Sequence, residues 1–342
     1  MNTKALAETT HRLSSIKGAL AHLKTVKSWR RHNGDEDFLF ASDPFVADMN
    51  RILCSKAFRR LSRKTQVASF PINPHIRDRM SHTGEVTAIS VTIADILGLN
   101  MSLVQAIALG HDIGHVPMGH PGEAFLAERS GRPFTHEVMG VIIAQKIERH
   151  CRGLNLTHQV LEGMFRHSGK NFSPDMTPEA MVVRIADKVA YLFSDYNDFV
   201  RMGHPIGHEL KVVVESFGAN QRKRVAETIS AICFESAEKD RVDFSESDAA
   251  VRFTELRTLM YEIYPCITAQ DPCGVLEPIY KFVEKSGIAD PLLVLSLMTD
   301  HDIDYLAAQH ALNSHHIRNT GAGDALDYIG DVQIDCKPSL DW

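Results

Sequence analysis

The sequence predicts a mostly α-helical protein, and three observations support this fold class. From Asp43 onward, apolar residues recur at three- and four-residue steps almost without interruption, which is the period of helices that bury one face. Typical helix-capping residues precede two of these runs. Signals for strands are weak, and only the stretch from Gln66 to Ile72 is rich enough in valine and phenylalanine to predict a short extended segment.

Two consecutive helices are predicted in the first third of the chain. The apolar residues between positions 86 and 96 have helical spacing, so we expect an amphipathic helix of roughly fifteen residues that ends near Gly98. Ser102 is a suitable N-cap for the next helix, whose residues 103–109 are apolar nearly all round. Such a helix must be buried on every side.

The remaining organisation follows from local signals. Thr177 followed by Pro178 is typical of a helix start and predicts a long helix through residues 181–193. The first forty residues are predicted to form a helix and then a loop at 33–37. Beyond residue 205 we expect further helices separated by charged linkers such as 235–248, and a loosely ordered, glycine-containing tail after His316.

Composition and charge exclude several classes of protein. The 342 residues are 44% hydrophobic and 23% charged, as in water-soluble globular proteins, and the longest uncharged run, 96–110, is too short to cross a bilayer. Six cysteines are scattered without a CxxC pair, and no apolar secretory segment opens the chain, so we expect a cytoplasmic protein. The net charge of −6 argues against a dedicated polyanion-binding surface.

Histidine is unusually concentrated in one part of the chain. Nine of the 18 histidines fall between positions 75 and 167. Imidazole is the commonest metal ligand in proteins and the acid–base group best matched to neutral pH. The concentration therefore indicates either a metal site or an acid–base site.

Two imidazoles and two carboxylates lie on three predicted helices. His82 falls on the apolar stripe of the first helix, and His111-Asp112 follow the buried helix. Asp187 interrupts the otherwise apolar stretch 181–193, where a carboxylate is costly to bury unless it is paired or bound to a metal. A mixed nitrogen and oxygen donor set suits Mn²⁺, Fe²⁺, Co²⁺, Mg²⁺ or Zn²⁺.

The segment from His111 to Glu123 is rich in both titratable and helix-breaking residues. It holds three histidines and two carboxylates in thirteen residues, together with five glycines and prolines. We expect an irregular loop at the rim of an active site rather than a core element. His120 and Glu123 are three residues apart, close enough for the carboxylate to orient the imidazole.

Four ordered motifs carry a family resemblance, which is dense over roughly residues 43 to 200. Residues 55–67 contain AFRRL and KTQV, residues 77–86 read RDRMSHTGEV, residues 111–123 read HDIGHVPMGHPGE, and residues 184–199 form the part of a predicted helix that carries Asp187. Residues 298–300, Met-Thr-Asp, match a further short element. The chain resembles the HD-domain hydrolases, and within them the deoxyguanosine triphosphate triphosphohydrolase-like branch.

The resemblance implies a helical HD fold with additional C-terminal helices, divided into residues 1–40, a catalytic core at 41–210 and an extension at 211–342. It implies hydrolysis of deoxynucleoside triphosphates to deoxynucleoside and triphosphate, with one divalent metal ion. The residues implied are His82, His111, Asp112 and Asp187 for the metal; His120, Glu123, His115 and His136 for catalysis; and Gln66, Arg79, Lys188, Tyr191 and Asp195 for the substrate.

Several alternatives remain open at this point. The same four metal ligands would serve a phosphomonohydrolase acting on deoxynucleoside monophosphates, and a non-catalytic nucleotide-binding or nucleic-acid-binding protein is a third reading. A basic run that contacts single-stranded DNA would fit the last of these, and its residues are Arg59, Arg60, Arg63 and Lys64. Related enzymes assemble into oligomers, so we expect a homo-oligomer. Met118 and Gly84 depart from the family pattern, and we expect both to influence which base fits.

Overall fold

The computed structural model describes residues 3–32, 43–67, 73–169, 171–267, 272–335 and 340. Within these ranges the chain is helical, and its β pairing is confined to two isolated bridges, Arg30 with Thr157 and Thr65 with Asp78. The all-α prediction is confirmed. The helices are α1 (Thr3–Ser15), α2 (Pro44–Leu53), α3 (Lys56–Arg60), α4 (Arg79–Leu97), α5 (Met101–Gly110), α6 (Gly119–Ser130), α7 (His136–Ile142), α8 (Glu148–Cys151), α9 (His158–Arg166), α10 (Pro178–Arg201), α11 (His208–Ser216), α12 (Gln221–Glu238), α13 (Asp248–Ile267), α14 (Pro272–Ser286), α15 (Pro291–Ser296), α16 (Asp300–Ala307) and α17 (Ser314–Arg318).

Helices α4 and α5 follow one another as predicted, with one correction at the cap. The side chain of Asp78 accepts a hydrogen bond from the backbone N–H of Ser81 and starts α4, and Gly98 ends it in the left-handed conformation at φ 81°. The N-cap of α5 is Asn100, whose side chain accepts from Leu103 N. Ser102, predicted to be this cap, lies inside the first turn, because Asn100 offers an equally good acceptor two residues earlier.

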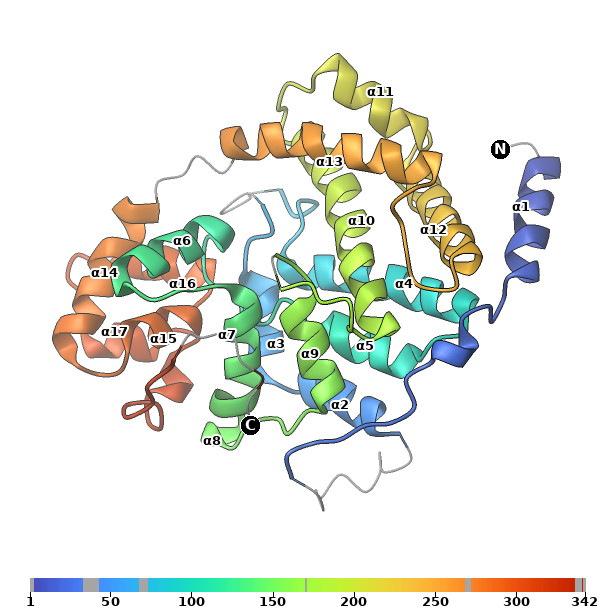
Figure 1. The fold of residues 1–342 in the computed structure, drawn as a ribbon. Helices are drawn as coiled ribbons and strands as arrows, with labels where there is room; N and C mark the ends of the chain where they lie inside the picture. The colour runs from blue at the N-terminus through green and yellow to red at the C-terminus, as the bar shows by residue number, and fades with distance from the viewer. Residues whose placement is uncertain are drawn as a thin grey trace.

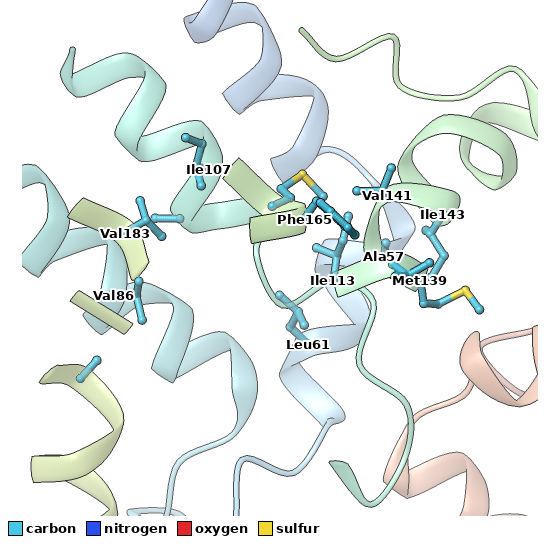
Figure 2. Packing of buried hydrophobic residues seen from close by; sticks show 14 of the residues in the cluster. Ala57, Leu61, Val86, Ile107, Ile113, Met139, Val141, Ile143, Phe165 and Val183 are labelled. Carbon is cyan, nitrogen blue, oxygen red and sulfur yellow. The ribbon is translucent and has the colours of Figure 1, made fainter. Parts of the chain in front are cut away.

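Helix α10 begins as the sequence predicts. The Thr177 side chain accepts from the backbone N–H of Ala180, and Pro178 occupies the first turn, where its missing N–H costs nothing. Helices α4, α5 and α10 pack against one another in the core of the fold. Figure 2 shows Val86, Ile107 and Val183, one from each of these helices, and all three are fully buried.

The later helices surround this core on two sides. In Figure 1, α11, α12 and α13 lie around α10, whereas α14, α15, α16 and α17 gather beside α6. The contacts of α13 with α10 and of α14 with α6 join both groups to the core. No helix in the described part of the chain combines the length and the apolar character that a membrane crossing requires. The three-part division of the chain stays a prediction.

Two sequence-based expectations about irregular segments are wrong. The tail after His316 is packed where it is described, since Ile317, Ala322 and Ile329 are fully buried. The charged linker begins later than predicted because α12 continues to Glu238. Glu235 lies in that helix and accepts hydrogen bonds from the backbone N–H groups of Ser245, Glu246 and Ser247. The predicted break at 33–37, and most of the predicted extended segment, lie outside the described residues.

The glycine- and proline-rich segment also differs from the prediction. Instead of staying irregular through Glu123, it becomes helical at Gly119, where α6 begins. Proline and glycine are tolerated there because the first N–H groups of a helix lack intrahelical partners. His120 and Glu123 therefore lie three residues apart on one helix face.

Candidate metal centre and active site

A cavity of about 710 Å³ opens between α4, α6, α7, α10 and α13. Its size is in the range of small-molecule sites in proteins. Twelve of the thirteen site residues named from the sequence line it: Gln66, Arg79, His82, Asp112, His115, His120, Glu123, His136, Asp187, Lys188, Tyr191 and Asp195. The thirteenth, His111, is not a lining residue but lies directly against the floor, with Nε2 3.3 Å from Asp112 Oδ1.

Four potential metal ligands converge at the floor of this cavity. Ligand atoms of His82, His111 and Asp112 lie within 4.8 Å of one another. Asp187 Oδ1 lies 3.0 Å from His82 Nε2 and 3.9 Å from His111 Nε2. All four residues are at most 9% exposed, so bulk water solvates them poorly. Helices α4 and α10, together with the end of α5, bring these groups together.

The protonation of these groups fits a divalent cation. His111 Nδ1 lies 2.6 Å from the carbonyl of Ala108 and so carries the ring proton, which leaves Nε2 as a buried acceptor without a hydrogen-bonding partner. Burial would raise the pKa of Asp112, but His111 and His115 hold it well below its usual range. Burial also opposes ionisation of Asp187, yet its hydrogen bond with His82 and the neighbouring imidazoles lower its pKa to about 2. Two anionic oxygens and one free imidazole lone pair are the donors that a divalent cation requires.

Glu123 forms the centre of a second cluster on the neighbouring wall. Its Oε1 lies 2.9 Å from His115 Nδ1, 3.0 Å from His136 Nδ1 and 3.4 Å from His120 Nδ1. His136 donates to it, whereas His115 Nδ1 is not aligned for a hydrogen bond. The sequence paired Glu123 with His120 alone, but in the structure three imidazoles share this carboxylate.

The ring geometry argues that this second cluster is not a metal site. The rings of His115 and His136 are stacked with centroids 3.6 Å apart and planes at 15°. An imidazole nitrogen binds a metal in the plane of its ring at about 2 Å, and one ion cannot lie in two nearly parallel planes at this separation. The cluster is better suited to hold charge and protons.

The carboxylates of the second cluster determine which of its histidines is protonated. Burial would lower the pKa of His136, but Glu123 and Glu137 outweigh it and raise that pKa to about 9. Burial, with Arg79 and His136 adding to it, lowers the pKa of His115 to about 3. At neutral pH, His136 is therefore an imidazolium that keeps Glu123 ionised, and His115 is neutral.

His167 extends this chain of contacts, although the sequence did not single it out. Its Nδ1 lies 2.7 Å from the carbonyl of Met164, so its free Nε2 accepts from His136 Nε2 at 3.2 Å. Burial and the neighbouring His111 lower the pKa of His167 to about 4, as an acceptor role requires. Its place among the nine clustered histidines was the one available signal.

Close backbone packing explains the glycines of this segment. A Cβ on Gly114 would lie 2.1 Å from the carbonyl oxygen of His136 and 2.2 Å from Gly140 N. A side chain at either contact would push α7, and with it His136, away from Glu123.

Met118 adopts a left-handed conformation at φ 63°, which is costly for a residue other than glycine.

The wall of the cavity that α10 forms beside Asp187, together with Gln66, carries groups suited to a sugar and its phosphates. Gln66 Oε1 is buried without a hydrogen-bond partner. Tyr191 and Asp195 follow Asp187 on one face of α10, as their spacing predicts, and Lys188 lies beside them. Burial, with Arg184 and Arg257 adding to it, lowers the pKa of Lys188 to about 8, so this cation lacks a sufficient negative partner.

Two tyrosines of α13 complete this wall, and sequence analysis missed both. Tyr261 OH lies 3.0 Å from Tyr191 OH, and Tyr264 OH donates to Asp195 Oδ2 at 2.6 Å. The other carboxylate oxygen of Asp195 accepts from Arg77. Arg79, expected to face phosphates, lines the cavity but donates to Asp112 Oδ2 at 2.8 Å.

Two other sequence-based expectations change with the geometry. In the basic run, Arg59 and Arg63 are exposed, whereas Lys64 is fully buried and Arg60 approaches Glu148. The run is therefore not one continuous surface. Gly84 is exposed and does not line the cavity, so it does not lie at the site, and its influence on the base stays a prediction.

Comparison with known proteins finds a family model that matches the site region. Residues 79–192 match the HD domain, a range that contains all four potential metal ligands. This stretch of the chain is therefore similar to an HD domain.

Several curated proteins are similar to a longer part of the chain than the HD domain alone. The chain is 40% identical over 229 residues to a deoxyguanosinetriphosphate triphosphohydrolase-like protein of Desulfatibacillum aliphaticivorans, covering 64% of this chain and 65% of that protein. A protein of the same name from Clostridium tetani is 38% identical over 228 residues, with the same coverage. The resemblance found in the motifs is confirmed, and the matched region spans slightly less than two thirds of these relatives. A solved structure of a hypothetical protein from Aquifex aeolicus aligns with 19% identity and a TM-score of 0.47, covering 77% of this chain and 68% of that one.

Proposed function

We propose that this protein is a metal-dependent phosphohydrolase that converts deoxynucleoside triphosphates, dGTP or several of them, to deoxynucleoside and inorganic triphosphate. The observation that carries the proposal is the convergence of His82, His111, Asp112 and Asp187 on the floor of one cavity. The names of the relatives support the same class of reaction.

The donor set defines what the metal contributes. His82, His111, Asp112 and Asp187 would hold one divalent cation, which when bound supplies Lewis-acid stabilisation of charge on a phosphate oxygen. Lys188 neutralises further phosphate charge from the side of the cavity, and Arg79 keeps Asp112 ionised and in place. The metal itself, among manganese, magnesium, cobalt, iron and zinc, is not distinguished by this donor set.

The second cluster supplies proton transfer. The reaction adds water across the bond between the α-phosphorus and O5′: triphosphate keeps the oxygen of water, and O5′ of the deoxynucleoside gains a proton. Glu123 Oε1 lies 3.4 Å from Nδ1 of His120, so the ionised carboxylate favours a proton on Nδ1 and leaves Nε2 free to exchange a proton with the reacting groups. The side chain of His120 is 74% exposed and lines the cavity, so substrate can reach it.

The substrate wall accounts for selection of a deoxyribose. Gln66 offers a buried acceptor without a protein partner, which suits a 3′-hydroxyl. Tyr191, held by Tyr261, lies along the same wall and leaves little room for a 2′-hydroxyl. Asp195 is tied to Arg77 and Tyr264, so its carboxylate is fixed in orientation before the sugar arrives.

Product identity tests the proposal. Each of the four deoxynucleoside triphosphates is incubated with Mg²⁺, Mn²⁺ or Co²⁺, and the products are separated by anion exchange. We expect triphosphate and deoxynucleoside, and none from a His82→Ala variant purified in parallel. Orthophosphate released from monophosphates alone would favour the phosphomonohydrolase, and salt-dependent binding of single-stranded DNA without turnover would favour a binding protein.

Assembly into a homo-oligomer remains a prediction that rests on the resemblance. Light scattering coupled to size-exclusion chromatography measures it directly.

A further inference from the structure

Two buried side chains outside the cavity contact two loops that carry or precede proposed active-site residues: the loop at Gln66 and the loop from His115 to Met118. Lys64 is fully buried and Asp300 is 2% exposed, and neither lines the cavity. Asp300 is the first residue of α16, far along the chain from both loops. Such charged groups are costly to bury unless each polar atom has a partner.

Asp300 divides its two oxygens between the loops. Its Oδ2 accepts from the backbone N–H of Thr65, next to Gln66, and its Oδ1 accepts from Met118 N, two residues before His120; both distances are 3.0 Å. The capping of α16 does not require Asp300, because Thr299 and Asp302 form the capping box. Both oxygens are thus committed to positions near the cavity.

Lys64 makes the complementary contact. Its ammonium group donates to the carbonyl of His115 and, at 3.4 Å, to that of Ser296, just before α16. Its own carbonyl accepts from Arg79 N at 3.0 Å, where α4 begins. Lys64 and Asp300 therefore connect the Gln66 loop, the loop from His115 to Met118, and the start of α16.

The conformation of Met118 shows why such a link is needed. At φ 63° it is left-handed, a conformation that surrounding contacts must impose on a residue with a side chain. Met118 is the N-cap of α6, so its backbone sets the direction in which His120 and Glu123 leave the loop. The bond from its N–H to Asp300 is a contact that holds this conformation.

We propose that Asp300, assisted by Lys64, is a positioning residue that fixes the Gln66 loop relative to His120 and Glu123. The inference rests on the proposed function for its effect on turnover, but not for its effect on the loops. Small displacements of catalytic groups can cost about 100-fold in rate. Loss of Asp300 should therefore lower turnover without removing any group that touches substrate.

The test compares Asp300→Ala with Asp290→Ala as a matched control. Asp290 is an acidic residue of the same C-terminal region that caps α15 and pairs with the partly exposed Arg132, and none of these contacts reaches the site loops. We expect hydrogen–deuterium exchange in peptides covering 64–67 and 115–120 to accelerate in Asp300→Ala and to stay as in the wild type in Asp290→Ala. Equal exchange in the two variants would overturn the inference, whether or not the wild type hydrolyses any nucleotide.

Turnover gives the second readout. We expect kcat of Asp300→Ala to fall by about 10- to 100-fold, with a much smaller change in KM. Adding Met118→Gly should restore part of kcat, because glycine adopts the left-handed conformation without the bond to Asp300. A double variant no faster than Asp300→Ala would contradict the assignment. If alanine prevents folding, Asp300→Asn, which keeps one acceptor, takes its place in both measurements.

Discussion

Asp187 on α10 and His82 on α4 meet at 3.0 Å between Oδ1 and Nε2, although 105 residues separate them in the chain. This contact brings one carboxylate and one imidazole to the point where His111 and Asp112 also converge. Hydrogen bonding with His82 lowers the pKa of Asp187 against the opposing effect of burial. The pair is thus preorganised as two ligands of a cation.

Asp187→Asn should weaken metal binding strongly. The amide keeps the shape of the side chain but removes a negative charge from the donor set, so we expect a loss of Mn²⁺ affinity of at least about 100-fold, together with loss of turnover. Isothermal titration with Mn²⁺ measures the affinity. Asp198→Asn serves as control, because Asp198 lies on the same helix and pairs with Arg77 and Arg201 outside the metal centre. Equal Mn²⁺ affinities in the two variants would contradict the assignment.

Glu123→Gln should lower kcat by about 100- to 10,000-fold, the usual range for acid–base groups. The amide can no longer stabilise the His136 cation or hold the Nδ1 proton of His120. Metal content should stay at the wild-type value, since Glu123 belongs to the second cluster. Loss of the metal in this variant, measured by atomic emission, would show that the two clusters are one site.

Stability should depend on pH through His136. Its pKa is raised in the folded protein to about 9 from an ordinary value of 6.5, so its stabilising effect is fully present below pH 6.5 and is lost as pH rises through 9. Urea unfolding in EDTA should show the wild type losing about 3 kcal/mol relative to His136→Gln between these pH values. Stability curves that run parallel for the two proteins would refute the charged state assigned to His136.

Tyr191→Ala should reduce discrimination between deoxyribose and ribose. A pocket that excludes an added hydroxyl discriminates by about 100-fold, and removing the ring opens space beside the sugar. The ratio of kcat/KM for dGTP and GTP is the measurement, and we expect it to fall at least about tenfold. Tyr261→Phe keeps the ring of Tyr191 and removes its hydroxyl partner, so it separates packing from hydrogen bonding. An unchanged ratio in Tyr191→Ala would exclude this tyrosine from sugar selection.

Gly114→Ala and Gly84→Ala should have opposite effects on stability. A Cβ at Gly114 would collide with the backbone of α7, so we expect a loss of about 3 kcal/mol or more in the free energy of unfolding. A Cβ at Gly84 meets nothing within 4 Å on the exposed face of α4, so alanine should stabilise by about 0.5–1 kcal/mol. Urea denaturation measures the free energy of unfolding of both variants. A small loss of stability in Gly114→Ala would contradict the close packing of this segment.

The metal ligands could be predicted from the sequence because they are ionisable residues within or at the end of apolar helices. Asp187 stands in an apolar helix, and His111-Asp112 end another, where an ionised group needs a partner. The helix start at Thr177 was an equally local signal, although the prediction placed the cap of α5 two residues late. Local chemistry therefore determines the helices and most of the donor set.

The missed residues act through contacts between distant segments. Tyr264 reaches Asp195 across 69 positions, and Asp300 reaches Thr65 across 235. No local pattern predicts these contacts, although residues 298–300 match a family motif, because the contacts depend on how α13 and α16 pack against the core. The tail after His316 was misjudged for a related reason: its glycines suggested disorder, but its scattered apolar residues fill space against neighbouring helices.

The central claim is that one divalent cation binds between His82, His111, Asp112 and Asp187. Anomalous diffraction from crystals grown with Mn²⁺ tests it most directly. We expect one strong peak at about 2.0–2.2 Å from the nearest nitrogen or oxygen atom of all four side chains. A peak among His115, His136 and Glu123 instead, or no ordered manganese near Asp187, would contradict the account.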